Sequence, residues 1–285
     1  MNVTAWQTSE VTSSDGVKLA VYESGNALGP EILFIHGFSQ AALCWQRQFD
    51  DAALLREFRL TAFDIRGHGA SDKPLEAARY SIDRQFAEDI QAVITGLGLK
   101  RPVLVAWSYA GRLVNDYAAA FGTAGLTGVN YVCARTMNDP RFNGPGTEFL
   151  SGMMSLDLAR NIAATRGFLA ACFAVPPPRE DFETALAYNM VIPAEIRAAH
   201  LSRPPRDGAD LAGLDLPVLV TQGSEDLLVS RGLGELTAEL VPGASLSIYE
   251  GIGHSPFTED APRFNRELAA FVRAATSSNG SNHPA

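Results

Sequence analysis

VLVAWSYAGRL, residues 103–113, decides the fold, because an apolar run of strand type passes directly into a segment with helical spacing. Ser108 stands at the junction of the two patterns. Ala106 and Ala110 occupy the positions where the nucleophile motif G-x-S-x-G has its glycines. The stretch therefore predicts a strand, a sharp turn and a helix, with Ser108 at the turn either as a nucleophile or as an ordinary structural serine.

The same alternation of strand and helix continues on both sides of this stretch. Short apolar runs rich in Val, Ile and Leu are typical of strands that are covered on both faces. Segments with helical spacing separate these runs, which predicts a mostly parallel sheet with helices on both faces, opened by an antiparallel hairpin at SSDG. We therefore expect an α/β fold with an eight-stranded sheet. The predicted strands are 11–12, 17–24, 31–37, 59–65, 102–108, 128–134, 216–223 and 245–251, and the predicted helices are 43–57, 82–97, 114–121, 230–240 and 261–275.

One interval, residues 135–212, breaks this alternation. It contains no run of strand type, but it has four segments of helical type that proline clusters at 176–178 and 204–205 punctuate. We interpret the interval as a helical cap inserted between two strands of the sheet. The predicted organisation is a core of residues 1–134 and 213–276, a cap of residues 135–212 and a disordered tail over 277–285.

Composition argues against several functional classes. The formal charge of −9 disfavours a nucleic-acid partner, because phosphate binding needs an excess of Lys and Arg. No apolar run reaches the roughly 18 residues of a membrane helix, and the first residues lack the pattern of a secretory signal. We expect a cytoplasmic protein without a membrane partner that acts on a small, uncharged or apolar molecule. The sequence leaves its oligomeric state open.

The cysteines and histidines show no metal-binding pattern. Cys44, Cys133 and Cys172 lack the spacing of a zinc or redox pair, and we expect them to be small buried hydrophobic residues. No group of His, Asp and Glu has the spacing of metal ligands. The sequence therefore implies neither a metal nor an organic cofactor.

Residues with catalytic chemistry follow several predicted strands, which is where ligands collect in parallel sheets. HGF follows one strand, Ser108 follows another, an acidic pair follows a third and GHSPF follows the last. This order of serine, acid and histidine, together with DIRGHGASD, resembles the α/β-hydrolase superfamily from Val11 to Ala275. The motifs are weak singly, and their common order makes the resemblance specific.

The resemblance implies a catalytic triad. Ser108 is the expected nucleophile, and His254, which lies between the last predicted strand and the last predicted helix, is the expected general base. Asp226 is the expected acid that orients the imidazole. Two alternatives stay open for this acid: the adjacent Glu225, which a solvated surface position explains better, and Asp139, because some members of the superfamily place their acid after that strand.

The two alanines beside Ser108 depart from the family motif. Alanine adopts ordinary backbone conformations, so we expect a modest repacking of the turn and not a forbidden geometry. Gly111 directly follows Ala110 and supplies local room.

Two backbone N–H groups are the expected donors to the oxyanion, those of Phe38 and Tyr109. Backbone donors leave both rings available to shape the acyl pocket, and simple packing is the alternative for Phe38. The predicted cap is rich in Phe and Met, which make adaptable apolar linings or equally the cap's own core. The predicted pocket consists of Phe38, Trp107, Tyr109, Met153, Met154, Phe168, Phe173, Met190 and Phe257.

These residues predict a serine hydrolase that cleaves carboxylic esters or lactones of small apolar acyl substrates through an acyl-serine intermediate. Hydrolysis of a carbon–carbon bond or a thioester, and peracid formation, would use the same triad. A lyase or a ligand receptor on the same fold is the alternative from another class. The sequence does not separate these activities.

Overall fold

The computed structural model describes residues 6–280, which form one eight-stranded sheet with the strand order β1-β2-β4-β3-β5-β6-β7-β8. β1 and β2 form the predicted hairpin, and β2 also runs antiparallel to β4. Every other pair of neighbouring strands is parallel, which confirms the predicted fold class. The strands are β1 (Gln7–Thr12), β2 (Lys18–Gly25), β3 (Glu31–Ile35), β4 (Arg59–Phe63), β5 (Val103–Trp107), β6 (Gly128–Val132), β7 (Val218–Gly223) and β8 (Ser245–Tyr249).

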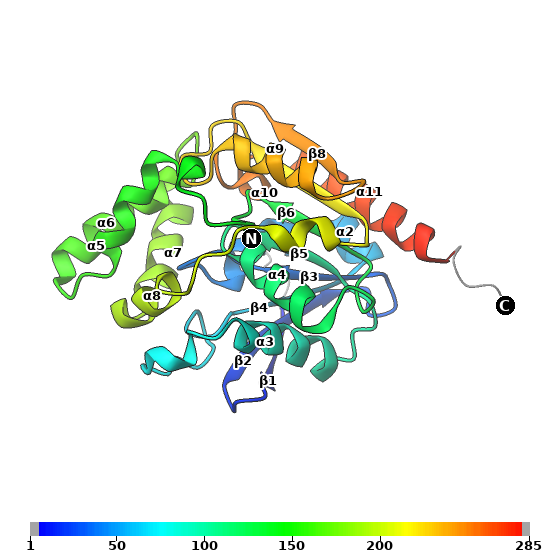
Figure 1. The fold of residues 1–285 in the computed structure, drawn as a ribbon, viewed down its shortest axis with the longest axis horizontal. Helices are drawn as coiled ribbons and strands as arrows, with labels where there is room; N and C mark the ends of the chain where they lie inside the picture. Colours follow the sequence, from blue (N-terminus) through cyan, green and yellow to red (C-terminus); the bar gives the residue numbers. More distant parts are fainter. Residues whose placement is uncertain (1–5, 281–285) are drawn as a thin grey trace.

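Helices cover both faces of the sheet (Figure 1). Alternate residues of β5 show why: Leu104 and Ala106 pack into the hydrophobic cluster on one face, and Val103 and Val105 pack into the cluster on the other. α3 (Asp83–Gly96), α4 (Ala110–Phe121) and α9 (Arg231–Leu240) bury apolar residues in the first cluster. η1 (Ala42–Trp45), α1 (Gln46–Phe49), α2 (Ala52–Glu57), α10 (Pro256–Glu259) and α11 (Ala261–Gly280) contribute to the second.

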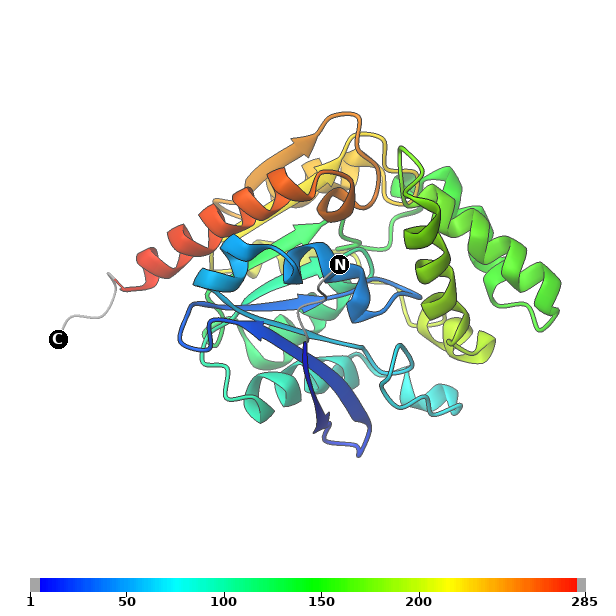
Figure 2. The same ribbon diagram turned by 180° about the vertical axis from the view of Figure 1, so that it is seen from behind.

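The segment between β6 and β7 contains helices and no strand of the sheet. Its helices α5 to α8 gather at one end of the sheet, and the view from behind shows the same arrangement (Figures 1 and 2). They lie in the segment that the sequence predicts as a cap, and we call them the cap helices below; that they cover the site stays a prediction. The elements of this segment are η3 (Pro140–Phe142), η4 (Pro145–Phe149), α5 (Leu150–Met153), α6 (Leu158–Ala171), α7 (Arg179–Met190), α8 (Ala194–Leu201) and η5 (Ala209–Gly213). A further short helix, η2 (Ala77–Arg79), lies between β4 and α3.

The buried guanidinium of Arg197 joins the cap helices. It donates hydrogen bonds to the Met153 carbonyl at 3.0 Å, to Asn161 Oδ1 at 2.8 Å, to Thr165 Oγ1 at 3.3 Å and to the Asn189 carbonyl at 2.5 Å. These acceptors come from α5, α6 and α7, whereas Arg197 itself belongs to α8. Burial lowers the pKa of Arg197 to about 10, because none of its acceptors is a carboxylate that would offset the desolvation.

The last helix is longer than the sequence pattern predicts. α11 continues to Gly280, so the prediction of a disordered tail is wrong for residues 277–280, and residues 281–285 lie outside the described part. The hydroxyl of Ser278 donates to the Ala274 carbonyl one turn earlier, which lets a serine-rich sequence stay helical. Among residues 6–280, no helix combines the length and apolar character needed to cross a membrane.

Candidate active site

Ser108 lies in a sharp turn between β5 and α4. Its backbone has φ of +54°, which is the left-handed region and is costly for a residue with a side chain. Three backbone hydrogen bonds hold this conformation. The Ser108 N–H donates to the Val132 carbonyl at 2.9 Å, and the Ser108 carbonyl accepts from Gly111 N–H at 3.0 Å and from Arg135 N–H at 2.8 Å. Ser108 is only partly buried, whereas its neighbours Trp107 and Tyr109 are buried.

The turn explains how two alanines replace the motif glycines. Ala106 and Ala110 are fully buried without any strain recorded in their backbone φ. The close approach falls instead on Gly111, where an added Cβ would lie 2.8 Å from the Cβ of Ala134. The glycine that lets α4 pack against the neighbouring strand end is therefore Gly111, one position later than the second glycine of the G-x-S-x-G motif.

Strained backbone gathers around this turn. Among residues 6–280, three non-glycine residues have positive φ: Ser39 at 59°, Ser108 at 54° and Cys133 at 44°. They follow β3, β5 and β6, which are adjacent strands of the sheet. Such strain persists where the surrounding structure fixes the chain, and it is common at functional sites.

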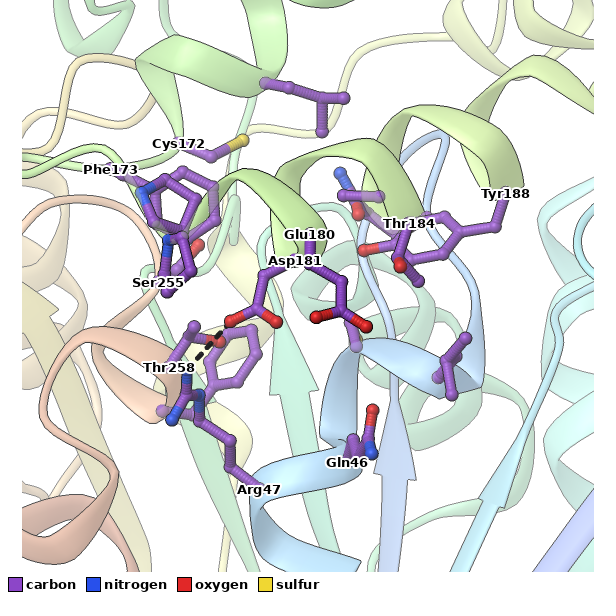
Figure 3. Close-up of a pocket in the computed structure, with 18 of the residues that line it drawn as sticks. Gln46, Arg47, Cys172, Phe173, Glu180, Asp181, Thr184, Tyr188, Ser255 and Thr258 are labelled. Atoms are coloured by element: carbon purple, nitrogen blue, oxygen red, sulfur yellow. Dashed lines mark hydrogen bonds and ion pairs between the residues drawn. The ribbon is translucent and has the colours of Figure 1, made fainter. Parts of the chain in front are cut away.

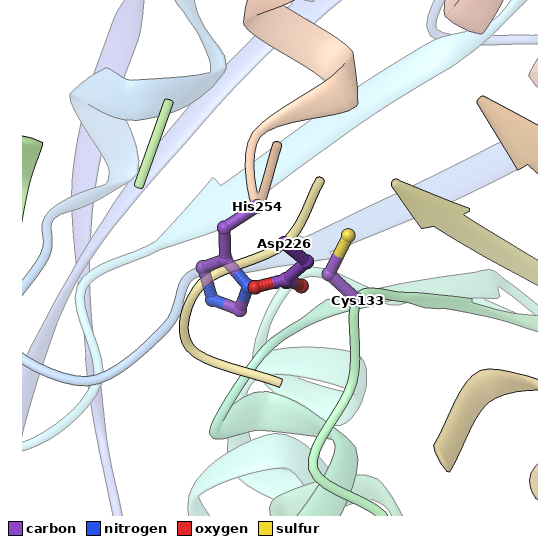
Figure 4. A group of neighbouring side chains, drawn as sticks. All are labelled: Cys133, Asp226 and His254. Carbon is purple, nitrogen blue, oxygen red and sulfur yellow. Dashed lines mark hydrogen bonds and ion pairs between the residues drawn. The ribbon is translucent and has the colours of Figure 1, made fainter. Parts of the chain in front are cut away.

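Asp226 and His254 form a buried pair after β7 and β8. His254 Nδ1 lies 2.7 Å from Asp226 Oδ2 (Figure 4). The other carboxylate oxygen accepts hydrogen bonds from Leu228 N–H at 2.8 Å and Val229 N–H at 2.9 Å. Because the carboxylate only accepts, the Nδ1 atom donates, and Nε2 of the neutral ring is left as a proton acceptor. This is the arrangement that a general base requires.

Trp107 places the histidine beside the turn. Its indole N–H donates to the His254 carbonyl at 2.8 Å, and the two rings lie 5.6 Å apart between centroids. Since Trp107 directly precedes Ser108, the structure brings the predicted nucleophile and base to neighbouring positions. Within residues 6–280 the Ser108 hydroxyl makes no hydrogen bond to His254; such bonds often tighten only when substrate binds.

The two alternative acids do not contact the histidine. Asp139 accepts three hydrogen bonds from Arg141, and this contact lowers the pKa of the partly exposed Asp139 carboxyl. Glu225 is exposed and accepts from the Ser224 hydroxyl at 3.0 Å. Of the three candidates, the structure brings Asp226 to His254.

The loop after β3 touches the turn that carries Ser108. A Cβ added at Gly37 would lie 3.0 Å from the Ser108 Cβ. In the described part of the chain neither the Phe38 N–H nor the Tyr109 N–H donates a hydrogen bond, although both residues are buried. The next residue differs, because the Ser39 N–H donates to His68 Nε2 at 3.1 Å. Two unpaired buried donors beside a serine match the requirements of an oxyanion hole.

A buried polar network, which sequence reasoning missed, connects this region to the cap. The Tyr109 hydroxyl accepts from Arg203 Nη1 at 2.9 Å and lies 3.3 Å from His200 Nδ1. The other nitrogen of His200 lies 3.3 Å from the Arg66 carbonyl, as does His68 Nδ1 at 3.1 Å. Burial lowers the pKa of His200 to about 3, which keeps the ring neutral. Periodicity gave no signal for these contacts, because they join residues distant in sequence.

A cavity of about 450 Å³ lies beside the site. Of the nine predicted pocket residues, only Trp107, Phe173 and Phe257 line it. Four others are buried in the hydrophobic cluster of the core and cap, and two are partly buried. These are Phe38, Tyr109, Met153 and Phe168 in the cluster, and Met154 and Met190 partly buried. The cavity instead includes polar residues of α7, which a search for apolar linings overlooks.

The ligand atoms of Cys133, Asp226 and His254 lie within 4.8 Å of one another (Figure 4). These are metal-ligating residue types, but the hydrogen bond between Asp226 and His254 already uses two of them. Burial raises the pKa of the Cys133 thiol well above its ordinary value, which favours the neutral thiol over the thiolate that binds metals. The cluster therefore fits an acid–base pair better than a metal centre.

The comparison with protein families agrees with this geometry. Residues 32–267 match the model of the alpha/beta hydrolase family, and the chain belongs to that family. It is therefore an enzyme of the α/β-hydrolase class, as the sequence predicted.

Individual relatives cover almost the whole chain. A Burkholderia cenocepacia protein provisionally described as an aryl esterase is 35% identical with a TM-score of 0.91, over 95% of this chain and 100% of that one. Esterase RhEst1 from Rhodococcus sp. ECU1013 is 31% identical with a TM-score of 0.86, over 94% and 99%. The non-heme chloroperoxidase CPO-A1 of Kitasatospora aureofaciens is 27% identical over 92% of this chain and 98% of its own length.

Proposed function

We propose that the protein is a serine hydrolase that cleaves carboxylic esters or lactones of small apolar acyl substrates. The observation that carries this proposal is the 2.7 Å contact between His254 Nδ1 and Asp226, placed beside the strained turn of Ser108. The likeness to two proteins described as esterases, at 35% and 31% identity, supports the same chemistry.

In this proposal each group has a distinct role. Ser108 Oγ attacks the ester carbonyl while its proton passes to His254 Nε2, and the Asp226 carboxylate stabilises the imidazolium that forms. The carbonyl oxygen becomes an oxyanion between the N–H groups of Phe38 and Tyr109, each worth roughly 3 kcal/mol of barrier in comparable sites. The leaving alcohol then departs with the proton from His254, and the acyl group stays on Ser108.

Water completes the cycle. His254 removes a proton from a water molecule that attacks the acyl-serine, and the same proton returns to Ser108 Oγ when the carboxylic acid leaves. Both half-reactions are balanced by these groups alone, so the proposal needs neither a metal nor an organic cofactor.

Perhydrolysis is a second candidate, which the likeness to a chloroperoxidase over 92% of the chain favours. In that reaction hydrogen peroxide replaces water as the attacker of the acyl-serine. The products are a peracid and free Ser108, and the triad performs the same proton transfers.

Covalent labelling tests the proposed function directly. We expect an organophosphonate probe to add once to the wild-type protein, and peptide mapping to place the adduct on Ser108. A panel of esters, lactones and thioesters, with and without hydrogen peroxide, then separates hydrolysis from perhydrolysis. Labelling of a different serine, or no labelling with no turnover of any ester, would refute the assignment.

A further inference from the structure

The cavity beside the site has a position and a lining that define a class of substrate. It lies between α7 of the cap and the η1–α1 segment of the core. Two of its residues adjoin the proposed catalytic pair, because Trp107 precedes Ser108 and Ser255 follows His254. Neither Ser108 nor His254 is itself among the lining residues, so the cavity begins one residue away from each of the proposed reacting groups.

Part of the lining is apolar, and Gln40 and Ser255 are buried polar residues among the lining residues. Trp107, Phe173 and Phe257 supply aromatic surface. Ser255 is only 1% exposed, and its Oγ has no hydrogen-bond partner in the described part of the chain. Although Ser255 directly precedes α10, its side chain does not cap that helix. A buried hydroxyl without a partner is unfavourable, so a rotation of the Ser255 side chain towards the cavity, where it would bond a polar atom of a bound molecule, is favoured.

The remaining lining carries an excess of negative charge. Asp50, Glu180 and Asp181 contribute carboxylates, and Arg47 is the only cationic residue among those that line the cavity. Arg47 already pairs with Asp181 at 3.0 Å. Figure 3 shows the Glu180 and Asp181 carboxylates pointing from the start of α7 towards the segment that carries Gln46 and Arg47. An anion that enters the cavity meets two uncompensated negative charges.

We propose that this cavity receives the larger group of the ester, that it selects neutral or positively charged groups over anionic ones, and that Ser255 Oγ bonds a polar atom of that group. The proposal rests on the proposed function and names its substrate class. Apolar walls favour a ring or a short alkyl chain, because burial of such surface drives binding. The carboxylates on α7 repel a carboxylate and attract a quaternary ammonium group.

Three phenyl acetates test the charge selection: the unsubstituted ester, the 4-carboxy ester and the 4-trimethylammonio ester. The variant is Glu180→Gln, and the matched control is Glu183→Gln, which removes the same charge one turn further along α7. Glu183 is exposed, pairs with Arg179 at 2.6 Å and does not line the cavity. The ratio of kcat/KM for the cationic and anionic esters is compared between proteins, so the intrinsic reactivity of each ester cancels.

We expect Glu180→Gln to lower the ratio of cationic to anionic turnover by about fivefold at low salt, as removal of one nearby charge predicts, and Glu183→Gln to leave it unchanged. About 1 M salt should remove most of the preference, because exposed charges are screened. An unchanged ratio in Glu180→Gln, or an equal change in both variants, would overturn the charge selection.

Ser255→Ala tests the hydroxyl. We expect KM for 4-acetamidophenyl acetate, which offers an amide to the hydroxyl, to rise about fivefold more than KM for phenyl acetate. Equal changes for the two esters would show that Ser255 only packs against the site.

A binding measurement separates this inference from the proposed function. Calorimetry of Ser108→Ala with benzyltrimethylammonium and with benzoate needs no turnover. Preferred binding of the cation, lost in the double variant with Glu180→Gln, would support the cavity even if no ester were hydrolysed. Equal affinity for the two ions would overturn this inference. The proposed function would still hold if the wild-type protein hydrolysed esters.

Discussion

At the strand ends, the Asp226 carboxylate accepts hydrogen bonds from two backbone N–H groups and from His254, whereas the buried Arg197 of the cap contacts only carbonyl, amide and hydroxyl oxygens. The first arrangement keeps an acid–base pair fixed on two adjacent strands. The second holds four cap helices together without any group that transfers a proton. In the proposed function, the sheet therefore carries the chemistry, and the inserted helices determine what reaches it.

The largest expected effect on kcat comes from a substitution at the strand ends of the sheet. We predict that Ser108→Ala lowers kcat for phenyl acetate by at least about 10⁴-fold, because no other group in the site supplies the nucleophile. The melting temperature should stay within a few degrees of the wild type, since the backbone bonds that shape the turn do not involve the hydroxyl. Steady-state kinetics and calorimetry measure both. Turnover close to the wild-type rate would show that another residue is the nucleophile. It would also contradict the view that the strand ends, and not the cap helices, carry the chemistry.

The choice of acid gives the second prediction. Asp226→Asn should lower kcat by about 10³ to 10⁴-fold, because an amide cannot stabilise the imidazolium and can select the wrong tautomer of His254. Asp139→Asn removes a partly exposed carboxylate that, among residues 6–280, pairs only with Arg141, and kcat should stay within about threefold. The reverse order of the two losses in kcat would transfer the role to Asp139.

The packing beneath the turn gives a smaller effect. Gly111→Ala would place a methyl group 2.8 Å from the Ala134 Cβ, so we expect the free energy of unfolding to fall by about 1–3 kcal/mol and kcat to fall at least tenfold as the turn shifts. Ala110→Gly should cost about 1 kcal/mol of helix stability and keep most of the activity. Urea denaturation and ester kinetics compare the two variants. Equal tolerance of both changes would show that the close approach at Gly111 is not needed.

Much of the α/β core was predictable from the sequence, because short motifs with catalytic residue types follow the apolar runs that form its strands. The apolar run before Ser108 and the motifs around Asp226 and His254 each mark the carboxyl end of a parallel strand. The approach of Asp226 to His254, 28 positions apart in sequence, follows from the adjacent positions of β7 and β8 in the sheet. The catalytic roles of these two residues and of Ser108 come from the family resemblance and stay predictions. The same reasoning identified the loop at Phe38 as the partner of the turn.

The contacts of the cap helices and the lining of the cavity were less predictable from the sequence, for physical reasons. An apolar residue in an inserted helix can pack against other side chains of the protein or against a substrate. Met153 and Phe168 are buried in the hydrophobic cluster that the core and the inserted helices share, where the Phe168 ring meets that of Phe38. The cavity is lined partly by Glu180 and Thr184, whose side chains look like a solvated helix face in sequence. Side-chain bonds between distant residues, such as that of Arg203 to Tyr109, leave no periodic trace at all.

The smallest expected effect comes from the contact that joins the Ser108 turn to the cap. Tyr109 offers its backbone N–H to the proposed oxyanion hole, while Arg203 and His200 from the cap end hold its hydroxyl. Tyr109→Phe removes these two contacts and keeps the N–H, so kcat should fall about fivefold, or ~1 kcal/mol, with KM changing less. Tyr117→Phe, in the helix that Tyr109 directly precedes, removes a hydroxyl that donates to Gln91 at 3.0 Å and should change neither constant. If both variants keep the wild-type kcat, the cap does not position the oxyanion hole, and the sheet alone sets the geometry of the reaction.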